Sequence, residues 1–172
     1  MKRQRDSKQD IIDCIFGQMD FFLLDDATVV SSGDKIAWKG AYLRLDDNKT
    51  GKKIEYPVLI KLLIPQDAVR THYCNKFFEQ YAKHRCSHAK VLGFYSYYTG
   101  KELIKYNDKI ARSVYNNVPL YEIGSYVRPD MYSWRLSACA HGIHFFWSKT
   151  SALLYLDQMC YLNDWKIRKN NM

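Results

Sequence analysis

The sequence predicts an α+β fold with a mostly antiparallel sheet, a strand–helix unit near the C-terminus and an N-terminal helix. Three observations lead to this prediction. Residues 9–24 place apolar side chains at helical spacing, and residues 149–162 do so again after a short apolar run. Between them lie apolar or alternating segments of strand length, separated by turn residues. A chain of 172 residues is long enough for one domain with a buried core.

The first predicted helix covers residues 9–24, where positions 11, 12, 15, 16, 19, 22 and 23 are apolar. Gly17 is a flaw in this pattern, because glycine is unfavourable inside a helix. The segment is amphipathic. We therefore expect it to pack on the body of the protein or to dock on a partner.

The centre of the chain predicts a β-hairpin. Residues 35–45 partly alternate between polar and apolar, and residues 54–64 form an apolar run closed by Pro65. Residues 46–51 (DDNKTG) separate the two segments, and Asp, Asn and Gly are the residues that tight turns favour.

The elements after the hairpin are shorter. We predict a helix over residues 74–83 and a strand over residues 89–98, followed by a turn at 99–101. Residues 103–106 are expected to return antiparallel to that strand. Residues 118–127 read as a strand that is broken at Gly124 and Ser125.

The clearest local signal is the strand–helix unit. Residues 142–147 (GIHFFW) have the length of a buried strand, and residues 149–162 follow with helical spacing. Ser148 stands where a helix N-cap belongs, because its hydroxyl can accept from a free amide of the first turn. We divide the chain into a basic tail with an amphipathic segment (1–34), one α+β domain (35–163) and a basic C-terminal tail (164–172).

The net charge of +8 lies mostly at the two ends of the chain. Residues 1–8 carry a net charge of +3, and the last seven residues carry another +3. This distribution predicts non-specific nucleic-acid contact through the tails rather than specific recognition. No apolar run reaches the roughly 20 residues of a membrane helix, so we expect no membrane association.

The cysteines and histidines offer weak metal ligands. The five cysteines follow no secretion signal, which predicts reduced thiols and a cytoplasmic location. His84, Cys86, His88 and Cys139 are weak zinc candidates, because their spacing is not that of a zinc finger. We expect buried cysteines and surface histidines instead, and no cofactor.

Four segments resemble a known family. These are VLIKLLIPQDAVR (58–70), RCSHAKVLGF (85–94), YEIGSYVRPDMYSW (121–134) and ACAHGIHFFWSKTSALLY (138–155). They are similar to the uncharacterised domain that often follows pentapeptide repeats in phage, bacterial and large-DNA-virus proteins, although this chain has no such repeats. The residues that carry the motif are Trp134, Cys139, Gly142, Ile143, His144, Phe145 and Phe146. The resemblance implies a viral or phage-type protein, located in the host cytoplasm or virion.

A weaker resemblance concerns ADP-ribosyltransferases. GIHFFWSKTSALLY is similar to one of their segments and WKGA (38–41) to another. This resemblance implies a pocket for NAD formed by Trp38, Lys39, His144 and Tyr155. The later glutamate of that family is absent, because the last Glu of the chain is Glu122. The sequence thus leaves it open whether the protein is an enzyme and favours the interpretation that it is not.

Two functions follow from these observations. The first is a non-enzymatic viral or phage-type accessory protein that binds a protein partner. The alternative is an NAD- or nucleotide-binding protein with an ADP-ribosyltransferase-like fold, active or degenerate. Two interpretations of residues 142–146 also stay open. They form either a core strand, whose glycine permits close backbone approach, or the wall of a small-molecule pocket. The sequence predicts no oligomeric state.

Overall fold

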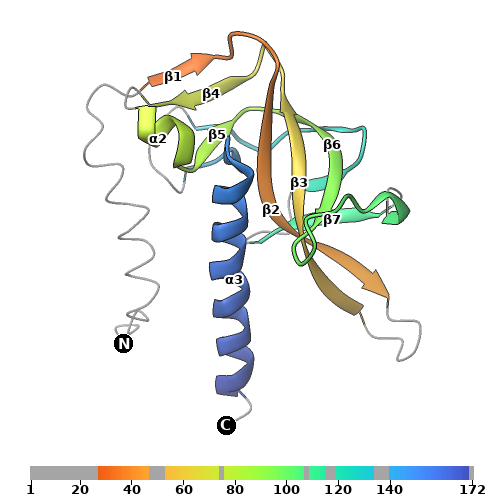
Figure 1. The fold of residues 1–172 in the computed structure, drawn as a ribbon. Coiled ribbons are helices and arrows are strands. Elements are labelled where there is room, and N and C mark those ends of the chain that lie inside the picture. Colours follow the sequence, from red (N-terminus) through yellow and green to blue (C-terminus); the bar gives the residue numbers. More distant parts are fainter. Residues whose placement is uncertain are drawn as a thin grey trace.

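A computed structural model describes residues 27–46, 53–73, 76–106, 109–114, 119–133 and 140–170 (Figure 1). The strands are β1 (Ala27–Val30), β2 (Lys35–Asp46), β3 (Lys53–Ile64), β4 (Val69–His72), β5 (His84–Cys86), β6 (Ala89–Ser96), β7 (Ile110–Ser113), β8 (Leu120–Glu122), β9 (Tyr126–Val127) and β10 (Ile143–Phe145). The helices are α2 (Lys76–Tyr81), the 3-10 helix η2 (Ile104–Tyr106) and α3 (Lys149–Asn170). The predicted helix over residues 9–24 lies outside the described residues.

The predicted α+β class is wrong, because the described part of the chain is mostly β and its main sheet is nearly a barrel. Six strands form an antiparallel sheet in the order β8-β7-β2-β3-β6-β9. Most of the strands that the sequence did not reveal are four residues or shorter, too short to show an alternating pattern.

The turn between β8 and β9 explains why the large sheet curls. These two strands form its opposite edges, yet only residues 123–125 separate them. In a flat sheet the edges would lie about 24 Å apart, since neighbouring strands are spaced by about 4.8 Å. A three-residue link spans at most about 14 Å. The sheet must therefore bend until its edges approach each other.

A bulge adds to this curvature. Lys61 pairs with Gly93 and Leu62 pairs with Val91, so Leu92 is an extra residue on β6. Such a bulge bends a strand and increases its twist. The turn itself is fastened to β6, because the amide of Val91 donates to Ser125 O at 3.0 Å and the amide of Gly124 donates to Val91 O at 2.8 Å.

A second antiparallel sheet, in the order β1-β4-β5-β10, adjoins the barrel. Its strands continue into the large sheet, since β1 leads into β2, β3 leads into β4 and β5 leads to β6. After β10, Phe146 exchanges two backbone hydrogen bonds of 2.8 Å with Trp38 of β2. The strand β10 thus joins the two sheets.

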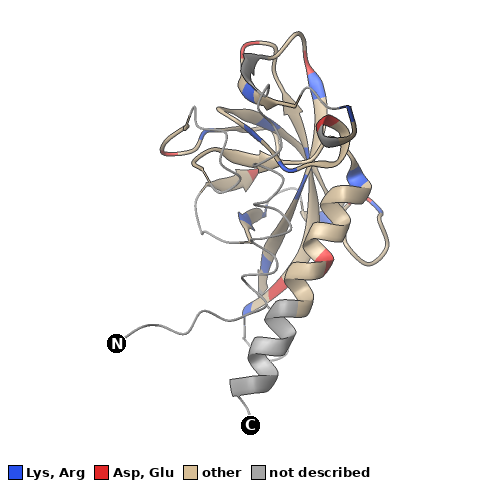
Figure 2. Ribbon diagram, turned by 90° about the vertical axis from the view of Figure 1, so that its left-hand side faces the viewer, with Lys and Arg blue, Asp and Glu red and all other residues tan. Residues whose placement is uncertain are grey.

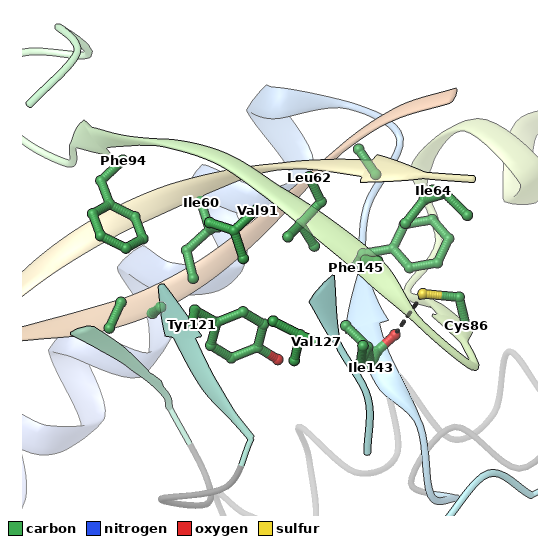
Figure 3. Packing of buried hydrophobic residues seen from close by; sticks show 14 of the residues in the cluster. Ile60, Leu62, Ile64, Cys86, Val91, Phe94, Tyr121, Val127, Ile143 and Phe145 are labelled. Carbon is green, nitrogen blue, oxygen red and sulfur yellow. Dashed lines mark hydrogen bonds between the residues drawn. The ribbon is translucent and has the colours of Figure 1, made fainter. Parts of the chain in front are cut away.

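The interior of the barrel holds the main core (Figure 3). Its strands point alternate side chains inward, as a sheet with one buried face requires. Tyr121 of β8 lies among residues of β3, β6 and β10, and Figure 3 shows their side chains directed at one another. The labelled core residues are Ile60, Leu62, Ile64, Cys86, Val91, Phe94, Tyr121, Val127, Ile143 and Phe145.

The helix α3 packs on the outer face of β2 and β3 (Figure 1). Among the described side chains of α3, those of Ala152, Leu156 and Met159 are buried. The contact depends on Gly40 of β2, where an added Cβ would lie 3.0 Å from the Cβ of Leu156. Glycine at this position lets the helix approach the sheet closely.

Several predicted elements are confirmed. They are the hairpin of β2 and β3, the helix α2, the strand β6, the break at Gly124 and Ser125, and the strand–helix unit of β10 and α3. The side chain of Ser148 accepts from the amide of Ser151 at 3.4 Å, at the predicted cap. The expected antiparallel return over residues 103–106 is confirmed only at its start, where Glu102 forms an antiparallel bridge with Tyr95 and the amide of Leu103 donates to Phe94 O at 2.8 Å. Residues 104–106 form η2 instead of a strand.

Two boundaries also differ from the prediction. Residues 164–170 continue α3 instead of forming a tail, since neither Gly nor Pro interrupts this segment. At the other end, Ala27–Val30 pairs with β4. Residues 27–30 therefore belong to the folded domain.

Candidate functional site

The four residues of the predicted pocket lie on two sides of β2. Trp38 and Lys39 are consecutive, so their side chains leave the strand on opposite faces. Trp38 lies on the outer face, with its ring centroid 5.2 Å from that of Tyr95 and 5.0 Å from the amine of Lys149. Lys39 lies between Ala37 and Ala41 on the inner, core-lining face of the strand.

Tyr155 and His144 do not complete a pocket with both of these side chains. Tyr155 of α3 packs on the outer side, with its ring 5.3 Å from Phe146 and 5.9 Å from the amine of Lys83. His144 meets Lys39 through its backbone oxygen. The structure therefore brings Trp38 and Tyr155 into one outer layer and directs Lys39 into the barrel.

Lys39 is a buried amine with few partners. Its Nζ donates to His144 O at 3.0 Å and lies 5.6 Å from the ring centroid of Tyr121. Only 7% of the residue is exposed. Burial, together with the positive charge of Lys83, lowers the pKa of Lys39 from 10.5 to about 8. Burial also raises the pKa of the neighbouring Cys86 thiol above its ordinary value.

A charged network lies beside the second sheet and is centred on Glu79 of α2. Arg70 Nη1 of β4 donates to Glu79 Oε1 at 2.9 Å. The amide of Tyr73 donates to Oε2 at 2.7 Å, and His72 Nδ1 is 3.2 Å from the same oxygen. Burial raises the pKa of Glu79, but the Tyr73 amide and the charges of His84 and Arg70 outweigh it and hold that pKa below its ordinary value.

His84 forms the inner wall of this network. Its ring is buried, and Nε2 lies 2.8 Å from the backbone oxygen of Glu79 while Nδ1 lies 3.2 Å from that of Thr71. Burial lowers the pKa of His84 despite the attraction of the Glu79 charge. A neutral ring donates best from Nε2, where the carbonyl acceptor is closer.

Trp147 lies where the network meets the barrel. Its ring centroid is 5.2 Å from Cζ of Arg70 and 5.8 Å from Nζ of Lys35, so two cations contact one ring. The ring also packs on Phe145 at 4.7 Å and on His84 at 5.5 Å. Arg70 Nε is buried and has no hydrogen-bond partner among the described residues.

The weak zinc candidates face different partners. Cys86 Sγ donates to Ile143 O at 3.8 Å, and His88 contacts Asp67 Oδ1 at 3.1 Å through Nε2 and Ser87 Oγ at 3.0 Å through Nδ1. Cys139 lies outside the described residues. In the described part of the chain, no three His, Cys, Asp or Glu side chains are grouped so that they could hold a metal ion.

The motif residues in and beside β10 contribute side chains to both hydrophobic clusters of the core. Phe145 packs in the barrel interior, whereas Phe146 packs under α3. Gly142 has a φ of 150°, and an added Cβ would lie 3.3 Å from Arg85 Cβ. This close approach is what the core-strand interpretation predicts for the glycine. Trp134 lies outside the described residues.

The sequence did not single out Arg70, Glu79 or Trp147 as site residues. The segment VRTH of β4 has only four residues, and an arginine there normally indicates a solvent-facing position. Its burial depends on Glu79, nine positions later, and on Trp147, which is far away in the chain. No local sequence signal identifies such a contact.

None of the described helices combines the length and the apolar character needed to cross a membrane.

Comparisons with known proteins place the chain in a family. No curated protein and no solved structure matches the chain. Residues 26–152 match the model of a family of unknown function, DUF5758. Because this match covers more than half of the sequence, the chain belongs to that family.

Proposed function

We propose that this chain is a non-enzymatic accessory protein that binds a protein partner through α3. One observation carries the proposal. Leu154 and Tyr161 are 59% and 64% exposed, and their spacing of seven residues places them on one face of the helix. That face is opposite the one on which Ala152 and Leu156 are buried against the barrel.

The surroundings of this face define the chemistry of the partner. The described side chains of α3 are mostly uncharged, with Lys149 and Asp157 as the exceptions (Figure 2). An apolar groove on the partner fits this mostly uncharged face. An exposed helix face with apolar anchors is a common way to bind such a groove.

The finer parts of the proposal rest on the sequence. The motif of residues 138–155 supports kinship with the domain that follows pentapeptide repeats, and hence a viral or phage-type protein. The reduced thiol of Cys86 fits a cytoplasmic location. The alternative, an ADP-ribosyltransferase-like NAD protein, has less support, because Trp38 and Lys39 face opposite sides of β2.

The test uses photo-crosslinking in the host cell. A benzoylphenylalanine at position 161 is expected to crosslink to one host or viral protein, whereas the same probe at position 98 does not. Tyr98 is the matched control, because it is 68% exposed and lies outside α3. The captured protein is then purified, and its affinity is measured by calorimetry.

Leu154→Asp is expected to weaken binding of that purified protein at least tenfold, while the melting temperature stays within about 2 °C. Ile104→Asp, at a residue 69% exposed on η2, is expected to leave the affinity unchanged. Equal effects of the two substitutions, or equal crosslinking from both probes, would contradict the proposal. A crosslink to a second copy of the chain would also contradict it.

A further inference from the structure

The junction of the two sheets holds more positive than negative charge. Lys35 Nζ of β2 and Arg70 Cζ of β4 both lie against the Trp147 ring. Lys39 lies four residues further along the same face of β2, where its Nζ donates to His144 O. Glu79 is the carboxylate that contacts this group among the described residues, and Arg70 and the Tyr73 amide already bind both of its oxygens. The charges of Lys35 and Lys39 are thus left without a described carboxylate.

Uncompensated charge is costly inside a protein. Removing an ammonium or guanidinium group from water is unfavourable unless a counter-charge and hydrogen bonds replace the lost hydration. The lowered pKa of Lys39 has the same physical origin. An anion that entered this junction would supply the missing counter-charge.

The donors at Trp147 define where such an anion fits. Arg70 is only 4% exposed, and its Nε has no partner among the described residues. Lys35 Nζ and Arg70 Cζ both lie within 6 Å of the Trp147 ring centroid. Lys35 is half-buried, so its own side chain reaches solvent.

We propose that Arg70, Lys35 and Trp147 form a binding site for a phosphate group. A guanidinium N–H and an ammonium group are the donors that phosphate oxygens accept from in proteins. The Trp147 ring supplies a flat wall beside them. The phosphate is either a free ion or part of a nucleotide, and two arms of one experiment distinguish these sources. This site shares no residue with the proposed interface on α3.

The experiment is an NMR titration of the full chain labelled with 15N. Inorganic phosphate is added at pH 7 and at constant ionic strength, with sodium chloride as the reference salt. We expect saturable shifts at Arg70 Nε–H and at the Trp147 indole N–H, which Arg70→Lys and Trp147→Phe assign. A parallel titration uses adenosine monophosphate. Tighter binding of the nucleotide assigns the phosphate to a nucleotide, and equal binding assigns it to the free ion.

Lys35→Met is the deciding variant, because Lys35 is half-buried and its loss spares the Arg70–Glu79 pair. It is expected to weaken phosphate binding about tenfold or more, as the loss of a charged donor does. Lys90→Met is the matched control, since Lys90 is half-buried like Lys35 and its Nζ also lies against one aromatic ring, 5.7 Å from that of Tyr126 instead of Trp147. The affinity of the Lys90→Met variant for phosphate should equal that of the wild type.

Three results would overturn the proposal. They are the absence of saturable shifts with both phosphate and the nucleotide, shifts that sodium chloride reproduces at the same ionic strength, and equal affinities of Lys35→Met and the wild type. Because Lys35 and Lys90 carry the same kind of cation–ring contact, a general loss of positive charge would lower both affinities alike. That outcome would also contradict a specific site.

Discussion

The amine of Lys39 hydrogen-bonds to the backbone oxygen of His144 at 3.0 Å and so ties β2 to β10 inside the barrel. This bond crosses 105 positions of the sequence. The buried ammonium group has this one carbonyl acceptor as its hydrogen-bond partner. Its burial, together with the positive charge of Lys83, lowers the pKa of Lys39 to about 8. The relationship makes the stability of the barrel dependent on pH in a defined range.

The first prediction concerns that range. Because the pKa of Lys39 is lower in the folded chain than its ordinary 10.5, the unfolded chain binds more protons between about pH 8 and 10.5. The Lys39 contribution therefore destabilises the fold below pH 8 and is relieved as the pH rises. Between pH 7 and pH 9 the wild type should gain about 1 kcal/mol of unfolding free energy that the Lys39→Met variant does not gain, because the variant has no amine to deprotonate.

Urea denaturation at pH 7, 8 and 9 measures this difference. Lys61→Met is the control, because Lys61 pairs with Trp38 on the same two strands but faces outward. Comparison with the variant also cancels the opposite trend expected from Cys86 and Tyr121, whose pKa values burial raises. A difference that stays constant over the three pH values would show that Lys39 is not buried as a charged group.

The second prediction concerns the carboxylate of Glu79. Glu79→Gln should cost about 3 kcal/mol at pH 7, because it leaves Arg70 as a buried cation without its partner. The folded pKa of Glu79 is lowered, so its stabilisation is present above the ordinary value of 4.5 and is lost as the pH falls through the folded pKa.

Denaturation at pH 7 and at pH 3.5 checks both parts. The cost of Glu79→Gln should shrink in acid, whereas Glu55→Gln, at an exposed position of β3, should cost less than about 0.5 kcal/mol at either pH. If Glu79→Gln were as mild as Glu55→Gln at pH 7, the Arg70–Glu79 pair would not support the fold.

The third prediction concerns the packing of α3 on β2 at Gly40. Gly40→Ala should destabilise the protein by about 1–3 kcal/mol, because the new methyl group would lie 3.0 Å from Leu156 Cβ and push the helix from the sheet. Gly93→Ala is the matched control. Its methyl group would meet Glu102 Oε1 at the same distance, but that atom ends a flexible and exposed side chain.

A double-mutant cycle with Leu156→Gly identifies the cause. The loss from Gly40→Ala should be smaller in the Leu156→Gly background, since that substitution removes the Cβ that the new methyl group would meet. Additive losses would place the cause elsewhere in β2.

The fourth prediction concerns metal removal. The melting temperature should stay within about 1 °C after treatment with EDTA, because His84, Cys86 and His88 already contact protein acceptors and donors. Bound structural zinc would make the protein lose stability on chelation. A drop of more than about 5 °C that zinc restores would show a site that includes residues outside the described part of the chain.

The sequence predicts the long elements well for a physical reason. The strands β2 and β3 have 12 residues each, and the turn residues between them, 46–51, mark both ends. The α3 helix begins at a polar cap and continues with helical spacing. In these segments the local pattern and the final packing favour the same structure.

The barrel itself could not be predicted in this way. Closure depends on β7, which has no predicted counterpart, and on β8 and β9, which the sequence indicates only as one segment broken at Gly124 and Ser125. All three have four residues or fewer, too short for a pattern that shows which strands they pair with. The site depends on still more distant contacts. The resemblance to ADP-ribosyltransferases places Lys39 in a pocket, but nothing local in the sequence shows that its amine contacts Tyr121 and His144, more than 80 positions away.

The three-residue turn at 123–125 has a consequence for the order of folding. It joins the two edges of a sheet whose inner strands must already be in register, so β8 and β9 can take their places only at a late stage. The same link makes the two edges open together. Hydrogen exchange at Tyr121 and Val127 should therefore proceed at one common rate, as a single unit of local unfolding.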